Sequence, residues 1–343
     1  MKKSKSKRID SLEFLKIIAI MMVIGLHYFN KDMGGILSEE KNIYGFLTHF
    51  LESFFIIACN IFILITGFFS INKKSISYNK IKKILFDIIF YAIVIFICYL
   101  IIGQHSISFH ILKTFFDSIF KRWFPIVYII VYLLIPYLNK LLNNISKKDY
   151  QRLLIIYIAF FSIWSVFINN ITIIDNGYGI TNFIFMYMVG GYIYKNQGDF
   201  KKTWLNYVVF FISLIFVFAL SLFSHARAWG YCSIFVVLES VSFFLIFLNI
   251  NMNNNLLSKI AKHSLAVYII HENQFISKFI YNSLFKSNNY YNNNLGMIIN
   301  LLISVFLILF ICTIIDCLKE KILLFIMSKY KKKDNEKIFS LSN

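Results

Sequence analysis

Six ionisable side chains stand inside the long apolar runs of this sequence, and they are its first candidates for chemistry. A charged group at the middle of a bilayer costs about 2.5 to 3.5 kcal/mol on insertion scales, so such residues are functional candidates by default. Histidine takes up or releases a proton near neutral pH, and a carboxylate beside it can orient the ring. The six side chains are His27, Glu52, Glu239, His271, Glu272 and Lys278.

Helical rise places some of these candidates at one side of a membrane. His27 lies fifteen residues into its apolar run, or about 22 Å from the start of that run. Glu52 lies six residues into the second run from its other end, about 9 Å deep, and His49 is shallower. We therefore expect His27, Glu52 and His49 to meet if the two helices pack side by side.

A second polar group, the HENQ turn, begins at His271. This histidine lies only six residues into its own run, so helical rise places it about 13 Å from the level of His27. The sequence thus predicts that the two histidines do not touch. Lipid cannot satisfy four consecutive polar residues, so the turn is expected to line a water-filled or ligand-filled cavity. The residues assigned to this lining are Glu239, His271, Glu272 and Asn273.

Each candidate also has a structural interpretation. A histidine near a helix end is often a packing residue held by a hydrogen bond, so His27 is open to either role. For Glu239, the alternative to a place in the cavity is pairing with Lys278 or with a backbone group.

The elements that must position these residues are membrane-spanning helices. Hydrophobic residues make up 58% of the 343, charged residues 15%, and the mean hydropathy is +0.67. A helix needs about 20 apolar residues to cross the hydrocarbon core. We predict an all-α integral membrane protein, a single domain over residues 1–343 with short basic tails at about 1–11 and 318–343. The expected bundle has about ten spans, at 12–30, 46–71, 84–102, 123–138, 153–169, 180–194, 204–223, 231–250, 265–285 and 295–317.

The net charge of +18 is explained by its distribution along the chain. If the loops alternate between the two sides, 26 of the 35 Lys and Arg residues lie on the side that holds both termini. This asymmetry follows the positive-inside rule and predicts that both termini are cytoplasmic. The distribution of positive charge therefore indicates how the protein is oriented in a cell membrane. It does not favour a nucleic acid as partner.

The five cysteines do not form a disulfide or metal-binding pattern. They are Cys59, Cys98, Cys232, Cys312 and Cys317, all inside or at the edge of predicted spans and without paired spacing. We expect them to be apolar packing residues, and we expect no metal site.

Four segments carry a recognisable combination of residues. They are RIDSLEFLKIIAIMMVIGLH with Arg8, Glu13, Leu15, Lys16 and His27; FFIIACNIFILITGFF with Thr66 and Gly67; WFPIVYIIVYLLIPYLNKL with Trp123, Phe124 and Pro136; and SLAVYIIHEN with Tyr268 and His271. In this order, over most of the chain, they resemble the acyltransferase 3 family of multi-pass membrane acyltransferases. The resemblance implies that His27 is catalytic.

The chain departs from the family pattern in two respects. Its members usually carry an Arg-x-x-Arg pair after the second helix, where this chain has Lys80 and Lys83. Lysine binds phosphate as a point charge and lacks the planar fork of arginine. The acidic residue of the first segment is Glu13 and not Asp.

The resemblance implies an acyl-CoA donor, acetyl-CoA being expected, and no bound cofactor. Its phosphates would bind the basic residues of the cytoplasmic side, while neutral His27 would act as general base and Glu52 would orient the ring. Arg122 and Asn60 are alternative donors to the oxyanion, and a covalent acyl-histidine is an alternative mechanism. The residues assigned to acyl-CoA binding are Arg8, Lys73, Lys74, Lys80, Lys82 and Lys83.

The acceptor implied by the resemblance is a hydroxyl of a surface polysaccharide or of its lipid-linked precursor. On the acceptor side we place His49, Arg122 and Trp123. A polysaccharide exporter with an intramembrane proton relay is the main alternative, and a scaffold for glycan-assembly enzymes is another. The sequence leaves the oligomeric state open.

Overall fold

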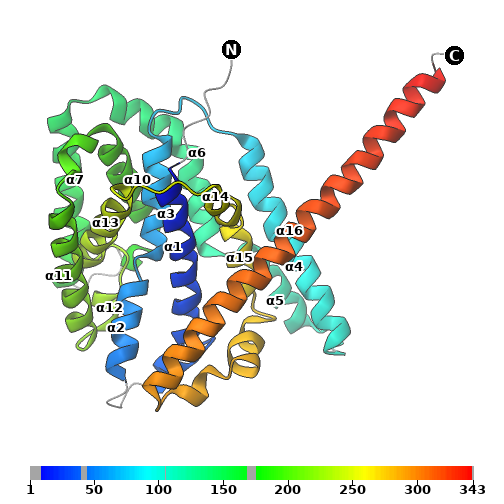
Figure 1. Ribbon diagram of the computed structural model, residues 1–343, viewed down its shortest axis with the longest axis horizontal. Helices are drawn as coiled ribbons and strands as arrows, with labels where there is room; N and C mark the ends of the chain where they lie inside the picture. The colour runs from blue at the N-terminus through cyan, green and yellow to red at the C-terminus, as the bar shows by residue number, and fades with distance from the viewer. Residues whose placement is uncertain (1–8, 40–44, 105, 168–174, 342–343) are drawn as a thin grey trace.

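The chain forms a bundle of helices, and the last part of its final helix extends away from the others (Figure 1). The structure is a computed structural model that describes residues 9–39, 45–104, 106–167 and 175–341, and side chains up to residue 329. Within these ranges the regular elements are all helical, which agrees with the predicted all-α class. Arg8 lies outside the described residues.

The first half of the bundle is built from long helices joined by short connections. These are α1 (Asp10–Phe29), α2 (Gly45–Phe55), α3 (Ala58–Ser70), α4 (Tyr78–Ile102), α5 (Phe109–Phe120), α6 (Trp123–Asn144) and α7 (Lys147–Tyr157), then a π-helix (Ile158–Ile163) and α8 (Trp164–Phe167). A 3-10 turn at Ile36–Glu39 follows α1.

The second half contains more short helices. It comprises a 3-10 turn (Asp175–Gly177), α10 (Ile180–Lys195), a second turn (Gln197–Phe200), α11 (Thr203–Ser221), α12 (His225–Ala228), α13 (Ile234–Leu248), α14 (Asn255–Ala261), α15 (Ser264–His271), a π-helix (Phe279–Leu284), a third turn (Ser287–Tyr290) and α16 (Asn294–Leu341).

The predicted count of ten spans is not confirmed. Six described segments are long and apolar enough to cross a membrane, namely 10–29, 45–70, 78–102, 109–144, 203–221 and 294–329. The predicted spans at 180–194 and 231–250 fall on α10 and α13, which have 16 and 15 residues. The predicted span at 265–285 is broken into α15, a turn and a π-helix. Apolar composition located these segments but did not reveal where their helices break.

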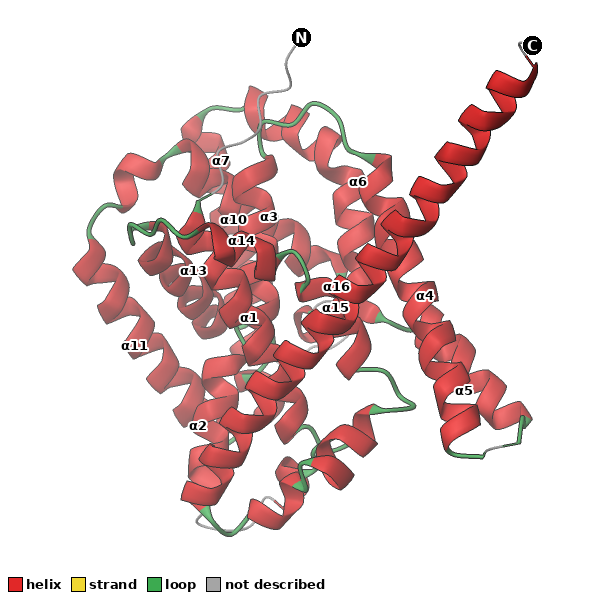
Figure 2. Cartoon of the chain, turned by 45° about the vertical axis from the view of Figure 1, so that its right-hand side comes forward, coloured by secondary structure: helices red, strands yellow, loops and turns green. Residues whose placement is uncertain are grey.

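The first helix lies at the centre of the bundle and the last helix at its edge. In its most apolar stretch α1 is 72% buried, whereas α16 is 28% buried. The end of α16 and the pair formed by α4 and α5 extend away from the other helices (Figure 2). The residues on α1 are therefore placed where side chains from several helices can converge.

Glycines let α3 and α10 approach each other very closely. A Cβ atom at Gly67 would lie 2.2 Å from the carbonyl oxygen of Tyr187, and one at Gly190 would lie 2.3 Å from that of Leu64. Small residues permit this approach of helix backbones in membrane bundles. Gly67 thus has a packing role within the second of the four resembling segments.

We predict that Gly67→Ala lowers the stability of the bundle, because the added methyl group meets backbone of α10 and not a movable side chain. The expected loss is about 1 to 3 kcal/mol, measured as a lower melting temperature in detergent. Gly198→Ala is the control, since a Cβ there has no neighbour within 4 Å. Equal melting temperatures for the two variants would contradict this packing role.

Candidate active site

His27 and His271 form a hydrogen-bonded pair inside the bundle. Nδ1 of His27 lies 2.9 Å from Nε2 of His271. Nδ1 of His271 lies 2.5 Å from the carbonyl oxygen of Val267, which can only accept, so this Nδ1 carries a proton. In the neutral pair, Nε2 of His271 then accepts the proton on Nδ1 of His27. Nε2 of His27 is left with a free lone pair, the form that a general base requires.

The prediction that the two histidines lie at different depths is wrong, because the chain enters the bundle well before the apolar run that contains His271. The backbone N–H of Asn254 donates to Oδ2 of Asp10 at 2.8 Å, which fixes Asn254 level with the start of α1. Seventeen residues lead from Asp10 to His27, and seventeen from Asn254 to His271. At about 1.5 Å per helical residue, the two histidines reach similar depths.

Arg122 and Glu272 form a buried ion pair near the two rings. Nη1 of Arg122 lies 3.3 Å from Oε2 of Glu272, and Nε donates to the carbonyl oxygen of Ser118 at 2.7 Å. The Arg122 side chain is 5% exposed, and its charge acts on both histidines. A guanidinium has five N–H groups, so these two bonds leave donors for another acceptor.

Asn60 is a structural residue, which favours Arg122 as the oxyanion donor. Its side-chain nitrogen donates to the carbonyl oxygen of Tyr231 at 2.9 Å and to Oγ of Ser240 at 3.2 Å. Its Oδ1 accepts a bond from the amide of Asn182 at 3.1 Å. Both amide protons of Asn60 are therefore used in holding α3 against α13 and the segment that follows α12.

Glu52 and His49 do not join His27 in the predicted way. The hydrogen-bond partner of Nδ1 of His27 is His271, and Oε2 of Glu52 is buried without a hydrogen-bond partner in the described part of the chain. Nδ1 of His49 lies 3.1 Å from Oγ of Ser221, and its ring packs on His225. His27 of α1 faces α15, whereas the depths estimated from the sequence had predicted no contact with His271.

The remaining acidic and amide candidates are buried, but not as predicted. Glu239 is 0% exposed, and neither carboxylate oxygen has a hydrogen-bond partner among the described residues. Lys278 is exposed, and no ion pair joins it to Glu239 within the described chain. Asn273 follows α15, and its Oδ1 accepts the backbone N–H of Phe275 at 3.0 Å, which stabilises the turn.

A cavity of about 360 Å³ runs along one face of α3. From α3 and the residues after it, the lining comprises Cys59, Phe62, Ile65, Thr66, Phe69, Ser70 and Lys73. These positions follow helical spacing, and the fourteen residues from Cys59 to Lys73 cover about 21 Å at 1.5 Å each. We call this space the α3 cavity.

The α3 cavity stops next to the histidine pair. Tyr268, one turn before His271 on α15, lines it, and its ring centroid lies 6.4 Å from that of His27. Neither histidine lines the cavity, and neither do Glu239, Glu272 and Asn273. On α15 the lining residue is Tyr268, one turn before the predicted His271.

The other end of the α3 cavity is basic, and we call it the basic end. Its lysines are Lys16, Lys73, Lys80, Lys83 and Lys262. Lys74 and Lys82 were also assigned to the donor, but neither lines the cavity. Lys16 and Lys262 were not among the residues predicted to bind the donor. Lys16 could have been predicted, because it belongs to the first of the four family-like segments. Lys262 could not, because it reaches the cavity only through the break between α14 and α15.

Two of these lysines are the best placed to meet an anion. Nζ of Lys80 donates to the hydroxyl of Tyr128 at 2.6 Å, and Nζ of Lys73 donates to Oγ of Ser70 at 3.0 Å. Burial and the neighbouring charge of Lys80 lower the pKa of Lys73. A bound anion would relieve this repulsion. Lys83 and Lys262, in contrast, are both paired with Glu320, at 3.2 and 2.7 Å.

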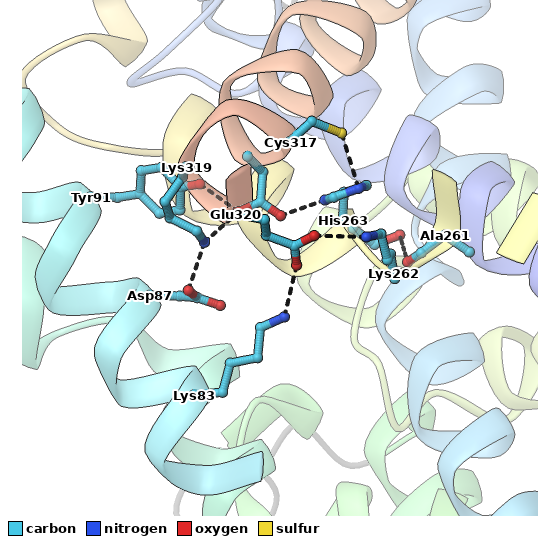
Figure 3. A network of polar contacts seen from close by, with 11 residues as sticks. Lys83, Asp87, Tyr91, Ala261, Lys262, His263, Cys317, Lys319 and Glu320 are labelled. Atoms are coloured by element: carbon cyan, nitrogen blue, oxygen red, sulfur yellow. Dashed lines mark hydrogen bonds and ion pairs between the residues drawn. The ribbon is translucent and has the colours of Figure 1, made fainter. Parts of the chain in front are cut away.

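A polar network joins α4, α16 and the α14–α15 junction beside this end (Figure 3). Nδ1 of His263 lies 2.5 Å from Oδ2 of Asp316, and Nε2 lies 3.3 Å from Sγ of Cys317. Tyr91 donates to Asp316 at 2.6 Å. Lys319 pairs with Asp316 and with Asp87.

The network is not arranged as a metal site. His263, Asp316 and Glu320 bring donor atoms within 4.8 Å of one another. However, the carboxylates of the network already pair with an equal number of ammonium groups, so a metal ion would add uncompensated charge. The partners are Asp87, Asp316 and Glu320 with Lys83, Lys262 and Lys319. All five cysteines are free thiols. Two of them also make polar contacts, Cys59 with the hydroxyl of Tyr231 at 3.5 Å and Cys317 with His263.

Trp123 belongs to an aromatic cluster near Arg122. Its ring stacks on Tyr231 with centroids 5.6 Å apart and meets Tyr178 at 4.9 Å. Tyr178 and Tyr231 also contact each other at 4.9 Å. The same cluster borders Asn60 through the backbone of Tyr231.

We predict that Asn60→Ala lowers the melting temperature, because it removes the buried hydrogen bonds that Asn60 makes with Tyr231, Ser240 and Asn182. Each unsatisfied group costs about 1 to 3 kcal/mol. Activity per folded molecule should change much less than stability. A fully stable variant that has lost activity would instead assign Asn60 to the reaction.

Comparison with protein families gives a match to the family described as an acyltransferase domain, over residues 9–317. Comparisons with curated proteins and with solved structures gave no match. The matched range contains both histidines, Arg122, the lysines of the α3 cavity and the long apolar helices. The chain therefore belongs to the acyltransferase 3 family of membrane acyltransferases.

Proposed function

We propose that the protein transfers an acyl group, acetyl in the simplest case, from acyl-CoA to a hydroxyl of a cell-surface polysaccharide or of its lipid-linked precursor. The observation that carries this proposal is the α3 cavity, which begins among lysines and ends at Tyr268 beside the pair of His27 and His271. Such a cavity suits a ligand with an anionic head and a long, largely neutral arm ending in a reactive group.

The donor is held by charge at one end and by shape along the rest of the cavity. Its phosphates bind Lys73 and Lys80, the two cationic groups at the basic end that have no carboxylate partner among the described residues. The pantetheine arm follows the apolar face of α3, and the thioester comes to lie beside Tyr268. A volume of about 360 Å³ lies within the range of about 300 to 1,000 Å³ typical of small-molecule sites.

His27 acts as the general base. Its free Nε2 takes the proton of the acceptor hydroxyl while the hydroxyl oxygen attacks the thioester carbonyl. The imidazolium formed is stabilised because Nδ1–H already donates to His271, whose own orientation is fixed by Val267. When the tetrahedral intermediate collapses, the carbon–sulfur bond breaks and the CoA thiolate takes the proton from His27.

Arg122 stabilises the negative charge of the intermediate. Its guanidinium is held by Ser118 and Glu272 and still has free N–H groups. A preorganised donor in a site without bulk water strongly favours a developing oxyanion. The acceptor sugar approaches from the side of Trp123, whose aromatic cluster offers rings for stacking on a sugar face.

The proposed orientation follows from the donor. Acyl-CoA is made in the cytoplasm, so the basic end and both chain termini face the cytoplasm, in keeping with the charge asymmetry. The acceptor then meets the thioester at the opposite side of the plasma membrane.

We predict that His27→Ala lowers transfer by about 10²- to 10⁴-fold, the usual contribution of a general base. The measurement is ester-linked acyl content of surface polysaccharide from cells that contain wild type, His27→Ala or no protein, with matched membrane levels. His271→Gln should retain more activity than His271→Ala, because a glutamine oxygen can still accept from Nδ1 of His27. Equal acylation in all cells, together with altered glycan export, would contradict the acyltransferase proposal and favour a polysaccharide exporter.

A second prediction separates the lysines that line the cavity from their neighbours. Lys73→Ala and Lys80→Ala should raise the KM for acyl-CoA several-fold with little change in kcat, because each removes a charge that binds the donor's phosphates. Lys74→Ala and Lys82→Ala are matched controls from the same basic segment, outside the lining. If all four variants behave alike, general surface charge attracts the donor and the α3 cavity does not bind it specifically.

A further inference from the structure

The network at the basic end contains a nucleophile, a base and an orienting group in series. Sγ of Cys317 lies 3.3 Å from Nε2 of His263, and Nδ1 of the same ring lies 2.5 Å from Oδ2 of Asp316. Asp316 is acceptor-only, so Nδ1 carries the proton and Nε2 faces the thiol with its lone pair. This is the arrangement by which a histidine activates a cysteine.

Sequence-distant elements hold the arrangement in place. Asp316 and Cys317 are consecutive on α16, and His263 enters between them from the junction of α14 and α15 (Figure 3). The Asp316 carboxylate is fixed by Tyr91 and by Lys319 as well. A histidine that served only to fill space would not require a carboxylate held by three partners.

Cys317 lies on the border between two faces of α16. The buried face carries Cys312 and Asp316, whereas Ile314 and Leu318 are 40% and 52% exposed on the outer surface of the bundle. The Cys317 side chain is partly exposed. Helical spacing places Ile314 and Phe310 on the line that leads from Cys317 back along α16, and Phe310 is 63% exposed. The thiol can therefore be reached from the outer surface while its base remains inside.

Cys317 lies at a change in composition along α16. It is two residues before the charged run Lys319–Glu320–Lys321, so it lies where charged residues interrupt the apolar stretch of α16. A long-chain acyl thioester places its chain in the bilayer and its thioester near that boundary. Juxtamembrane cysteines of this kind are typical acceptors of fatty acyl groups.

We propose that Cys317 is an S-acylation site that accepts a long-chain acyl group from a fatty acyl thioester, with His263 as base. His263 takes the thiol proton as Sγ attacks the thioester carbonyl. The bond from the carbonyl carbon to the donor's sulfur then breaks, and the leaving thiolate takes the proton from His263. The product is an acyl-Cys317 thioester whose chain lies along the exposed face of α16, and a free donor thiol.

This reaction is distinct from the transfer of acyl groups to a glycan, although Asp316 also lines the α3 cavity. It uses neither His27 nor His271, and its product stays on the protein. The modification would anchor the charged C-terminal part of α16 to the membrane surface, where the helix begins to extend away from the bundle (Figure 2).

The test is incubation of the purified full-length protein in detergent with palmitoyl-CoA, followed by peptide mass spectrometry and release by neutral hydroxylamine, which cleaves thioesters. We expect the acyl group on Cys317 in wild type and none at that peptide in Cys317→Ser. Cys98→Ser is the matched control, because Cys98 is also an exposed thiol of a long helix but has no histidine contact among the described residues. It should label as wild type does.

His263→Gln should label at least tenfold more slowly at equal folded fraction, judged by gel filtration. In the wild-type protein, labelling of Cys317 should exceed that of the more exposed Cys98. This comparison does not depend on the folding of any variant. Equal labelling of the two thiols, or undiminished labelling in Cys317→Ser, would overturn the proposal. Glycan acylation by Cys317→Ser reports separately on the proposed function, which this result does not affect.

Discussion

The hydrogen bond between His27 and His271 is the interaction on which the candidate site depends. It joins the central helix α1 to the short helix α15, and with the carbonyl oxygen of Val267 it determines which nitrogen of each ring carries a proton. A solitary His27 would be free to adopt either tautomer. The pair leaves its Nε2 without a proton in the neutral state, so the proposed base chemistry depends on backbone geometry at α15.

The break between α14 and α15 is what brings that pair together. It also places Lys262 at the basic end of the α3 cavity and His263 against α16, so one irregular segment contributes to the cavity, the base and the second cluster. Such breaks are tolerated at membrane depth where the freed polar groups find partners inside the protein. Here the side chains at the break find partners on α16, His263 with Asp316 and Lys262 with Glu320.

Composition and charge predicted an all-helical membrane protein, and the apolar runs located most of its helices. The ionisable residues in those runs included both histidines of the pair, whereas Arg122 lies just before a predicted span. Contacts between helices were harder to predict, because helical rise was counted from the first apolar residue and not from Asn254, where the chain meets Asp10. The lysines illustrate the same limit: once α4 is known to begin at Tyr78, helical spacing puts Lys80 and Lys83 on one face and Lys82 on another. The pairing of Cys317 with His263 carried no local signal, since the two are far apart in sequence.

The most direct test of this account is a cryo-electron microscopy structure with a non-hydrolysable acyl-CoA analogue. We expect phosphates beside Lys73 and Lys80, the pantetheine arm along α3, and the analogue of the thioester carbonyl next to Tyr268, within reach of Nε2 of His27. An analogue bound elsewhere, or one whose reactive end lies far from His27, would contradict it.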